Sequence, residues 1–145
     1  MTEDTGTRYR GHLALEEQMG FFYISDELAL GGGEDGGEVA VVVAGGEIDY
    51  AASPQLKARI AEHVEAGRTR LVLDLSTVTF IDSTAIGVLM GAVMRLDELG
   101  GGSVAVVCAE ENKRVLRIFE IVGIDSLLEL HSSREEAISA LATAG

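Results

Sequence analysis

The chain has 145 residues and a formal net charge of −13, and 47% of its residues are apolar. A chain of this length can bury a sizeable core as one domain, so neither a disulfide nor a structural metal is needed to hold it together. The negative charge repels phosphate backbones and anionic lipids, which argues against nucleic acid and membranes as partners. The composition predicts a compact helix-and-sheet domain.

The amino-terminal region divides into a polar segment and a first strand. Residues 1–20 carry many charges and show weak periodicity, so they predict a flexible tail or a loosely attached segment. This segment has no apolar stretch of the kind that a signal peptide needs, and no apolar run in the chain approaches the roughly 20 residues of a membrane span. We therefore expect a cytoplasmic protein whose single ordered domain comprises residues 21–145.

A glycine-rich stretch separates the first two expected strands. Residues 31–38, "GGGEDGGE", contain five glycines and three acidic residues, so they predict a flexible hairpin connection. A phosphate-binding loop is a poor interpretation, because no Lys, Ser or Thr follows and the acidic residues would repel phosphate.

From residue 38 onward, strand and helix patterns alternate along the chain. Apolar runs predict strands over 38–49, 69–82, 103–109 and 124–130. Apolar residues recurring every three or four positions predict helices over 53–66, 84–99, 111–122 and 132–142. With the strand that begins at residue 21, the alternation predicts an α/β domain with a mixed, largely parallel sheet of about five strands and four helices, whose amino-terminal hairpin is antiparallel.

Local signals mark the ends and inner faces of these helices. Ser53 is the expected N-cap of the first helix, with Pro54 at its first position, and Ser133 with Glu136 forms a capping box for the last. The expected inward positions of the first and third helices are Leu56, Ile60, Val64, Val115, Ile118, Phe119 and Val122.

Residues that often carry catalysis are few in this sequence. His12, His63 and His131 have no metal-ligand neighbours at helical spacing, so we interpret them as solvent-exposed or capping residues. Cys108 lies within an apolar strand pattern, "VAVVCA", which favours a packed structural thiol over a nucleophile. The sequence has no nucleophile elbow, P-loop or zinc-protease motif, so we expect no enzyme activity, no metal and no cofactor.

Short polar residues follow two of the expected strands, where a helix begins. Asp49 ends the second strand pattern, and the triplet formed by Asp82, Ser83 and Thr84 ends the third. Ligand and partner sites in open α/β sheets collect at such strand ends. The same three residue types are also the preferred helix N-caps, so the spacing alone favours capping over a binding role.

Three motifs in combination resemble a known family. The stretches "GEID" (46–49), "FIDST" (80–84) and "FEIVGI" (119–124) are similar to those of STAS-domain anti-sigma factor antagonists of bacteria, and the resemblance covers about residues 39–141. It implies the STAS fold and a regulatory binding protein. In that family the serine after the aspartate of the "D-S" motif is phosphorylated by a partner anti-sigma factor, which is a serine kinase; by position this serine is Ser83, with Thr84 as the second choice.

The resemblance implies a partner-switching function in transcription regulation. The unphosphorylated form would bind the kinase and release the sigma factor, phosphorylation would end binding, and a serine phosphatase would reset the protein. We expect a monomer or weak dimer. The predicted contact residues are Asp49, Asp82, Ser83, Thr84, Ile86 and Gly87. One departure from the family pattern is Ala85, where a glycine is usual, because a methyl group disfavours any positive-φ conformation there.

The sequence is compatible with two other functions. The chain could be a STAS scaffold subunit of a larger signalling assembly, which would have the size of a megadalton particle. It could also be a small hydrolase or nucleotide-binding domain that uses the acidic residues at the strand ends, but the sequence offers no nucleophile-base pair and no phosphate cradle.

Overall fold

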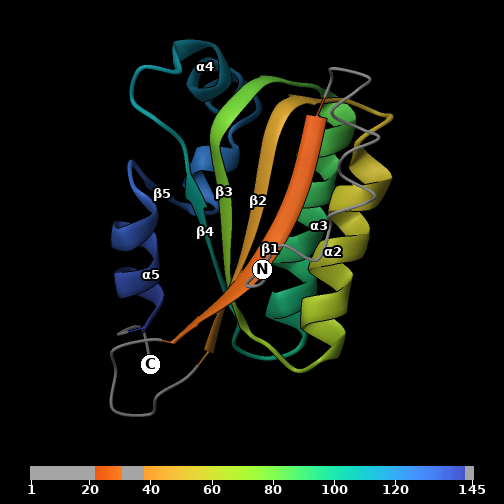
Figure 1. Ribbon diagram of the computed structural model, residues 1–145, viewed down its shortest axis with the longest axis vertical. Helices are drawn as coiled ribbons and strands as arrows, with labels where there is room; N and C mark the ends of the chain where they lie inside the picture. The colour runs from red at the N-terminus through yellow and green to blue at the C-terminus, as the bar shows by residue number, and fades with distance from the viewer. Residues whose placement is uncertain (1–21, 31–37, 143–145) are drawn as a thin grey trace, which may run out of the picture.

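A computed structural model describes residues 22–30 and 38–142 of the chain. Its five strands form one sheet in the order β1-β2-β3-β4-β5, in which β1 is antiparallel to β2 and the other pairs are parallel (Figure 1). The strands are β1 (Phe22–Leu30), β2 (Glu38–Ile48), β3 (Arg70–Ile81), β4 (Ser103–Val107) and β5 (Glu129–His131). The α-helices are α2 (Ser53–Glu65), α3 (Ser83–Glu98), α4 (Lys113–Val122) and α5 (Arg134–Ala142). The predicted mixed sheet and the antiparallel hairpin are confirmed.

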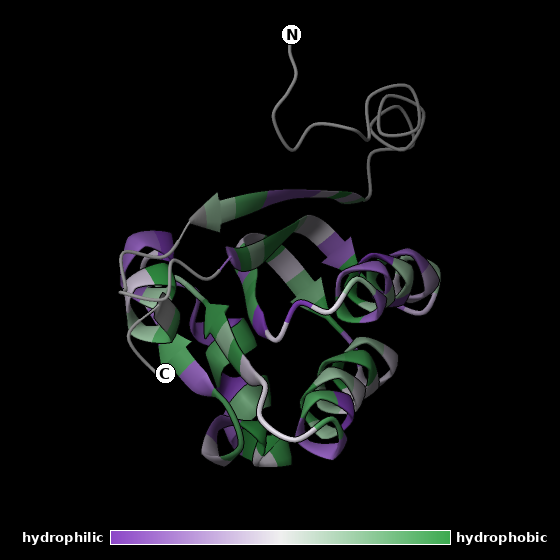
Figure 2. Cartoon of the chain, turned by 90° about the horizontal axis from the view of Figure 1, so that it is seen from below, coloured by the Kyte–Doolittle hydropathy of each residue, from purple (hydrophilic) through white to green (hydrophobic). Residues whose placement is uncertain are grey.

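Helices cover both faces of the sheet, because the central strands are apolar on both sides. Helices α2 and α3 lie side by side over one face, and α5 lies on the other (Figure 1). Alternate strand residues face the two layers: Leu71 and Leu73 of β3 belong to the larger core cluster, whereas Val72 packs with Ala137 and Leu141 of α5. Figure 2 shows hydrophobic strands between helices that expose polar residues.

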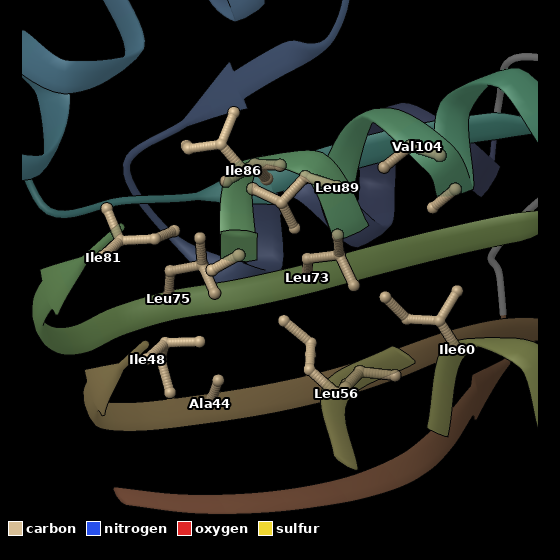
Figure 3. Packing of buried hydrophobic residues seen from close by; sticks show 14 of the residues in the cluster. Ala44, Ile48, Leu56, Ile60, Leu73, Leu75, Ile81, Ile86, Leu89 and Val104 are labelled. Atoms are coloured by element: carbon tan, nitrogen blue, oxygen red, sulfur yellow. The ribbon is translucent and has the colours of Figure 1, made fainter. Parts of the chain in front are cut away.

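The larger core lies between β2, β3 and the pair α2 and α3 (Figure 3). Leu56 and Ile60 of α2 point toward the sheet, as the sequence pattern predicts, and Leu89 of α3 packs against the same region. Cys108 follows β4 and belongs to this core, as predicted; burial raises the pKa of its thiol. No helix in the described part of the chain is long and apolar enough to cross a membrane.

Strand β3 is bent by extra residues and extends past β4. Its register with β2 shifts twice, because Val43 pairs with Asp74 but Gly45 pairs with Thr77, and a second shift follows Gly46. The carboxylate of Asp74 accepts hydrogen bonds from the backbone N–H and the hydroxyl of Ser76, which fixes the first bulge. Pairing with β4 ends at Asp74, so the last seven residues of β3 project beyond that strand.

Asp74 is also held by the carboxy-terminal helix. It is almost fully buried on the α5 face, and Arg134 Nε donates to its Oδ2 at 2.8 Å. Arg134 also donates through Nη1 to Glu27 of β1 at 3.1 Å. The two carboxylates raise the pKa of the Arg134 guanidinium, although its burial acts in the opposite direction. This ion-paired network joins β1, β3 and α5.

A second polar cluster ties β1 to α2. Asp26 of β1 accepts from Arg59 Nη1 at 2.8 Å through Oδ1, and its Oδ2 lies 2.8 Å from His63 Nε2. The interpretation of His63 as solvent-exposed or capping is wrong, because its side chain is buried against this aspartate. His131 lies in β5 and is half-buried, and His12 lies outside the described residues.

Three other expectations are wrong in detail. Ala52 is the N-cap of α2, and Ser53 is already helical, with its hydroxyl donating to the Asp49 carbonyl at 2.8 Å. Residues 124–130 do not form one strand: Gly123 ends α4 at φ +78°, a 3₁₀ turn spans Ile124–Ser126, and only Glu129–His131 is β-structure. Val122 does not face inward, since it is 47% exposed.

The cap of α5 and the buried face of α4 largely follow the sequence signals. Ser133 accepts a hydrogen bond from the Glu136 N–H at 3.1 Å, which confirms the serine half of the predicted capping box of α5. Val115 and Phe119 are fully buried as predicted, and Ile118 packs partly buried against the same cluster. The predicted tail (1–20) and nearly all of the predicted glycine-rich loop (31–38) lie outside the described residues.

Candidate functional site

The carboxyl ends of β2 and β3 lie next to each other and bring the two predicted polar segments together. Ile48 pairs with Ile81, and the Asp82 N–H donates to the Ile48 carbonyl at 3.3 Å. Asp49 and Asp82 therefore follow neighbouring strand ends, and α2 and α3 both begin at this edge of the sheet (Figure 1). This juxtaposition is the one that a parallel pair of strands imposes.

Asp49 organises the turn that leads into α2. Its carboxylate accepts from the N–H groups of Ala51 at 3.0 Å and Ala52 at 3.2 Å, and its carbonyl accepts from the Ser53 N–H at 2.9 Å. An aspartate that accepts from the backbone two and three residues ahead forms an Asx-type turn. Asp49 is thus a structural residue of this loop, held next to the start of α3.

Asp82, and not Ser83, is the N-cap of α3. Its backbone is extended, and its Oδ1 accepts from the Ala85 N–H at 3.0 Å. The Ile86 N–H donates to the Asp82 carbonyl at 3.0 Å, which closes the first helical turn. Ala85 fits this turn without backbone strain, because no non-glycine residue in the described ranges has a positive φ. Its methyl group is fully buried.

Ser83 and Thr84 occupy the first turn of α3 with exposed side chains. Within residues 22–30 and 38–142, neither hydroxyl forms a hydrogen bond. Gly87 is exposed one turn later. Ile86 is misplaced in the predicted contact set, because it is only 5% exposed and belongs to the core. The surface that remains at this edge contains Ser83, Thr84 and Gly87, with the two aspartates holding the loops beneath it.

The structure adds two aromatic residues that the sequence reasoning missed. Tyr50 follows Asp49 and is 74% exposed, and Phe80 near the end of β3 is 40% exposed. Large aromatic side chains are enriched in protein interfaces. The available signal for Tyr50 was a large aromatic residue in the short loop directly after Asp49. Phe80 could not be recognised, because the second bulge of β3 puts it out of phase with the buried positions.

A loop from the following β-α unit supports the projecting end of β3. Asn112, the N-cap of α4, donates through its side-chain amide to the Val78 carbonyl at 2.6 Å and accepts from the Val115 N–H at 3.3 Å.

The described residues include no group of three His, Cys, Asp or Glu side chains that could hold a metal ion. The main chemical feature of this edge is the exposed hydroxyl of Ser83, at the start of a helix that Asp82 caps.

The assignment of the cap leads to a stability prediction. Replacing Asp82 by alanine should lower the free energy of unfolding by about 0.5 to 2 kcal/mol, because the Ala85 N–H loses its acceptor. Ser83→Ala, the matched control, should change it by less than about 0.5 kcal/mol. Urea unfolding followed by circular dichroism measures both. An equal loss in the two variants would contradict the assignment of Asp82 as the cap.

Comparison with known proteins places this architecture in a family. The STAS domain model matches residues 34–137, so the chain belongs to the STAS domain family. Its relatives place it more narrowly among the anti-sigma factor antagonists, which confirms the resemblance seen in the motifs.

Two of these relatives and one solved structure show the extent of the similarity. BtrV of Bordetella bronchiseptica is 33% identical over 99 residues, which cover 68% of this chain and 83% of BtrV. The anti-sigma-F factor antagonist RsfB of Mycobacterium tuberculosis is 31% identical over 101 residues, covering 70% of this chain and 80% of RsfB. A crystal structure of an anti-sigma factor antagonist from Mycobacterium paratuberculosis aligns with a TM-score of 0.66 at 27% identity, over 81% of this chain and 93% of that one.

Proposed function

We propose that this protein is a phosphorylation-controlled antagonist of an anti-sigma factor. In its unmodified form it binds an anti-sigma factor serine kinase and frees the sigma factor. The kinase phosphorylates Ser83, the complex dissociates, and a serine phosphatase restores the binding form. The observation that carries the proposal is the exposed, unengaged Ser83 hydroxyl in the first turn of a helix that another residue caps.

The placement of Ser83 suits a reversible modification. Phosphorylation adds about −1.5 to −2 units of charge at pH 7, and a helix amino terminus accommodates negative charge. Asp82 already supplies the cap, so neither the serine nor its phosphate is needed to form α3. The free protein can therefore carry either state of Ser83 with the same fold.

The charge acts instead on the complex with the kinase. A partner surface that closes over a neutral hydroxyl has no counter-charge for a phosphate dianion, and a desolvated, unmatched charge costs several kcal/mol. The neighbouring Asp49 and Asp82 carboxylates add repulsion on the same edge. Tyr50, Ser83, Thr84 and Gly87 form the exposed part of the proposed contact surface.

The direct test uses the full chain and an anti-sigma factor serine kinase from the same genome. We expect the unmodified protein to bind the purified kinase, and hydrogen exchange to slow over residues 82–90 and around Asp49. With ATP, mass spectrometry should find one phosphate, on Ser83. Phosphate on Thr84 would reassign the acceptor, and unchanged hydrogen exchange over 82–90 in the complex would contradict the contact surface.

A further inference from the structure

A groove runs between α2 and α3 on the outer side of the larger core. It encloses about 500 Å³, and its first lining residue on α3 is Thr84, directly beside Ser83. Both helices begin at the same edge of the sheet and run in the same direction (Figure 1, Figure 2). Its floor and walls are mainly apolar: Ile60, Ala61, Val64, Val88 and Ala92, with Gly87 and Gly91.

The two glycines keep this groove open, and the fold itself does not need them. They are four residues apart on α3, so they lie on one face of the helix. A Cβ atom added at Gly87 or Gly91 would meet no atom within 4 Å. Glycine is less favourable than alanine inside a helix, and here packing within the chain offers no compensation. An occupant that comes close to the α3 backbone accounts for both residues.

The charges on the groove indicate the character of that occupant. Three charged residues line it: Lys57 near the first turns of α2, and Glu65 and Arg95 together at the opposite end, near the ends of α2 and α3. The charges of Glu65 and Arg95 are of opposite sign, so the cationic end of the groove is the one at Lys57, next to Ser83. In the part of the chain that the structure describes, Lys57 forms no ion pair. Lys57 complements a carboxylate on an otherwise apolar partner segment.

We propose that the α2/α3 groove receives an amphipathic helix of the anti-sigma factor kinase. The helix inserts apolar side chains over Gly87 and Gly91 and presents an acidic residue to Lys57. Recognition of an amphipathic helix by an apolar groove is a common mode of binding. This inference rests on the proposed function and names the part of the partner that the site accepts.

This geometry also explains how phosphorylation of Ser83 reaches the bound helix. Thr84 lines the groove and Ser83 precedes it, so a phosphate on Ser83 lies at the end where α2 contributes Lys57. The dianion repels the carboxylate that the kinase helix presents there and competes for the same cation. Phosphorylation of Ser83 therefore weakens the binding of the whole kinase helix in the groove.

The first experiment fills the groove without touching Ser83. Gly91→Leu should raise the dissociation constant for the purified kinase at least tenfold, because the new side chain occupies the space of the helix. Gly91→Ala, the graded variant, gains similar helix propensity but adds only a methyl group, so its dissociation constant should lie between those of wild type and Gly91→Leu. Circular dichroism and urea unfolding should show both variants folded and no less stable than wild type.

The second experiment tests the charges. Lys57→Glu should weaken kinase binding about tenfold, whereas Arg117→Glu, a matching charge reversal on the exposed surface of α4, should leave it within about threefold. If Gly91→Leu and Lys57→Glu bind like wild type while Ser83→Asp still weakens binding, the groove inference is wrong and the proposed function stands. If the wild-type protein itself does not bind the kinase, the proposed function is wrong.

A cross-linking experiment identifies the occupant directly. Glu65→Cys places one accessible thiol on the groove, since the only native cysteine, Cys108, is buried. A photo-reactive maleimide on this thiol should capture a kinase peptide with apolar and acidic residues at helical spacing. Cross-links to residues 1–21 of the same chain, to a second copy, or to a kinase segment without that pattern would overturn the inference.

Discussion

Ser83→Asp is expected to weaken kinase binding by about 1 to 3 kcal/mol while leaving the free energy of unfolding nearly unchanged. The fixed negative charge meets the partner surface that matched a neutral hydroxyl. The free energy of unfolding should stay nearly the same, because Asp82 caps α3 and an aspartate in the first helical turn interacts favourably with the helix dipole. Calorimetric titration with the kinase and urea unfolding measure the two quantities.

Ser83→Ala provides the matched comparison for that variant. It should hold the kinase with wild-type affinity and accept no phosphate, so the antagonist remains in its binding form. Phosphate incorporation with ATP and the same titration give the result. Full phosphorylation of Ser83→Ala, together with wild-type binding by Ser83→Asp, would show that Thr84 or another residue is the acceptor.

Asp74→Ala is expected to lower the free energy of unfolding by about 3 kcal/mol, the largest stability effect in this set. The substitution leaves the Ser76 N–H without its acceptor at the bulge of β3 and removes the better buried partner of Arg134. Urea unfolding measures the loss. The bulge directs the end of β3 toward the site, so kinase affinity should fall as well.

Glu27→Ala is the control for the ion pair. Glu27 contacts the same arginine at 3.1 Å, but its side chain is 38% exposed, and such pairs contribute at most about 1 kcal/mol. A loss for Asp74→Ala no larger than that for Glu27→Ala would show that the bulge and the buried carboxylate are not important for stability.

Most of the fold could be predicted because local patterns and the packing agree. The apolar spacing of Leu56, Ile60 and Val64 predicts one buried face, and all three are buried in the larger core. Residues 124–130 could not be resolved by pattern, since a short apolar run fits a strand or a turn equally well. Gly123, with its left-handed backbone, and the Ser126 hydroxyl, which donates to the Gly123 carbonyl at 2.8 Å, decide for the turn.

The candidate site was predicted in position but not in the role of each residue. Parallel pairing brings Asp49 next to Asp82, and this follows from topology alone. Asp, Ser and Thr are all good N-caps, so composition could not tell which residue caps α3; the extended backbone of Asp82 settles it. The burial of His63 on α2 was missed because its partner Asp26 lies 37 residues away on β1, and local periodicity carries no information about such contacts.

The burial of Cys108 gives this protein a built-in reporter of its own motions. A thiol reagent can modify the side chain only while the surrounding core is open, so the labelling rate depends on how often that region opens and closes. When closing is fast, the rate gives the population of the open form; when labelling outpaces closing, it gives the opening rate. A bound kinase that recognises only the closed protein slows labelling in proportion to its occupancy, which allows the interaction to be followed without an engineered probe.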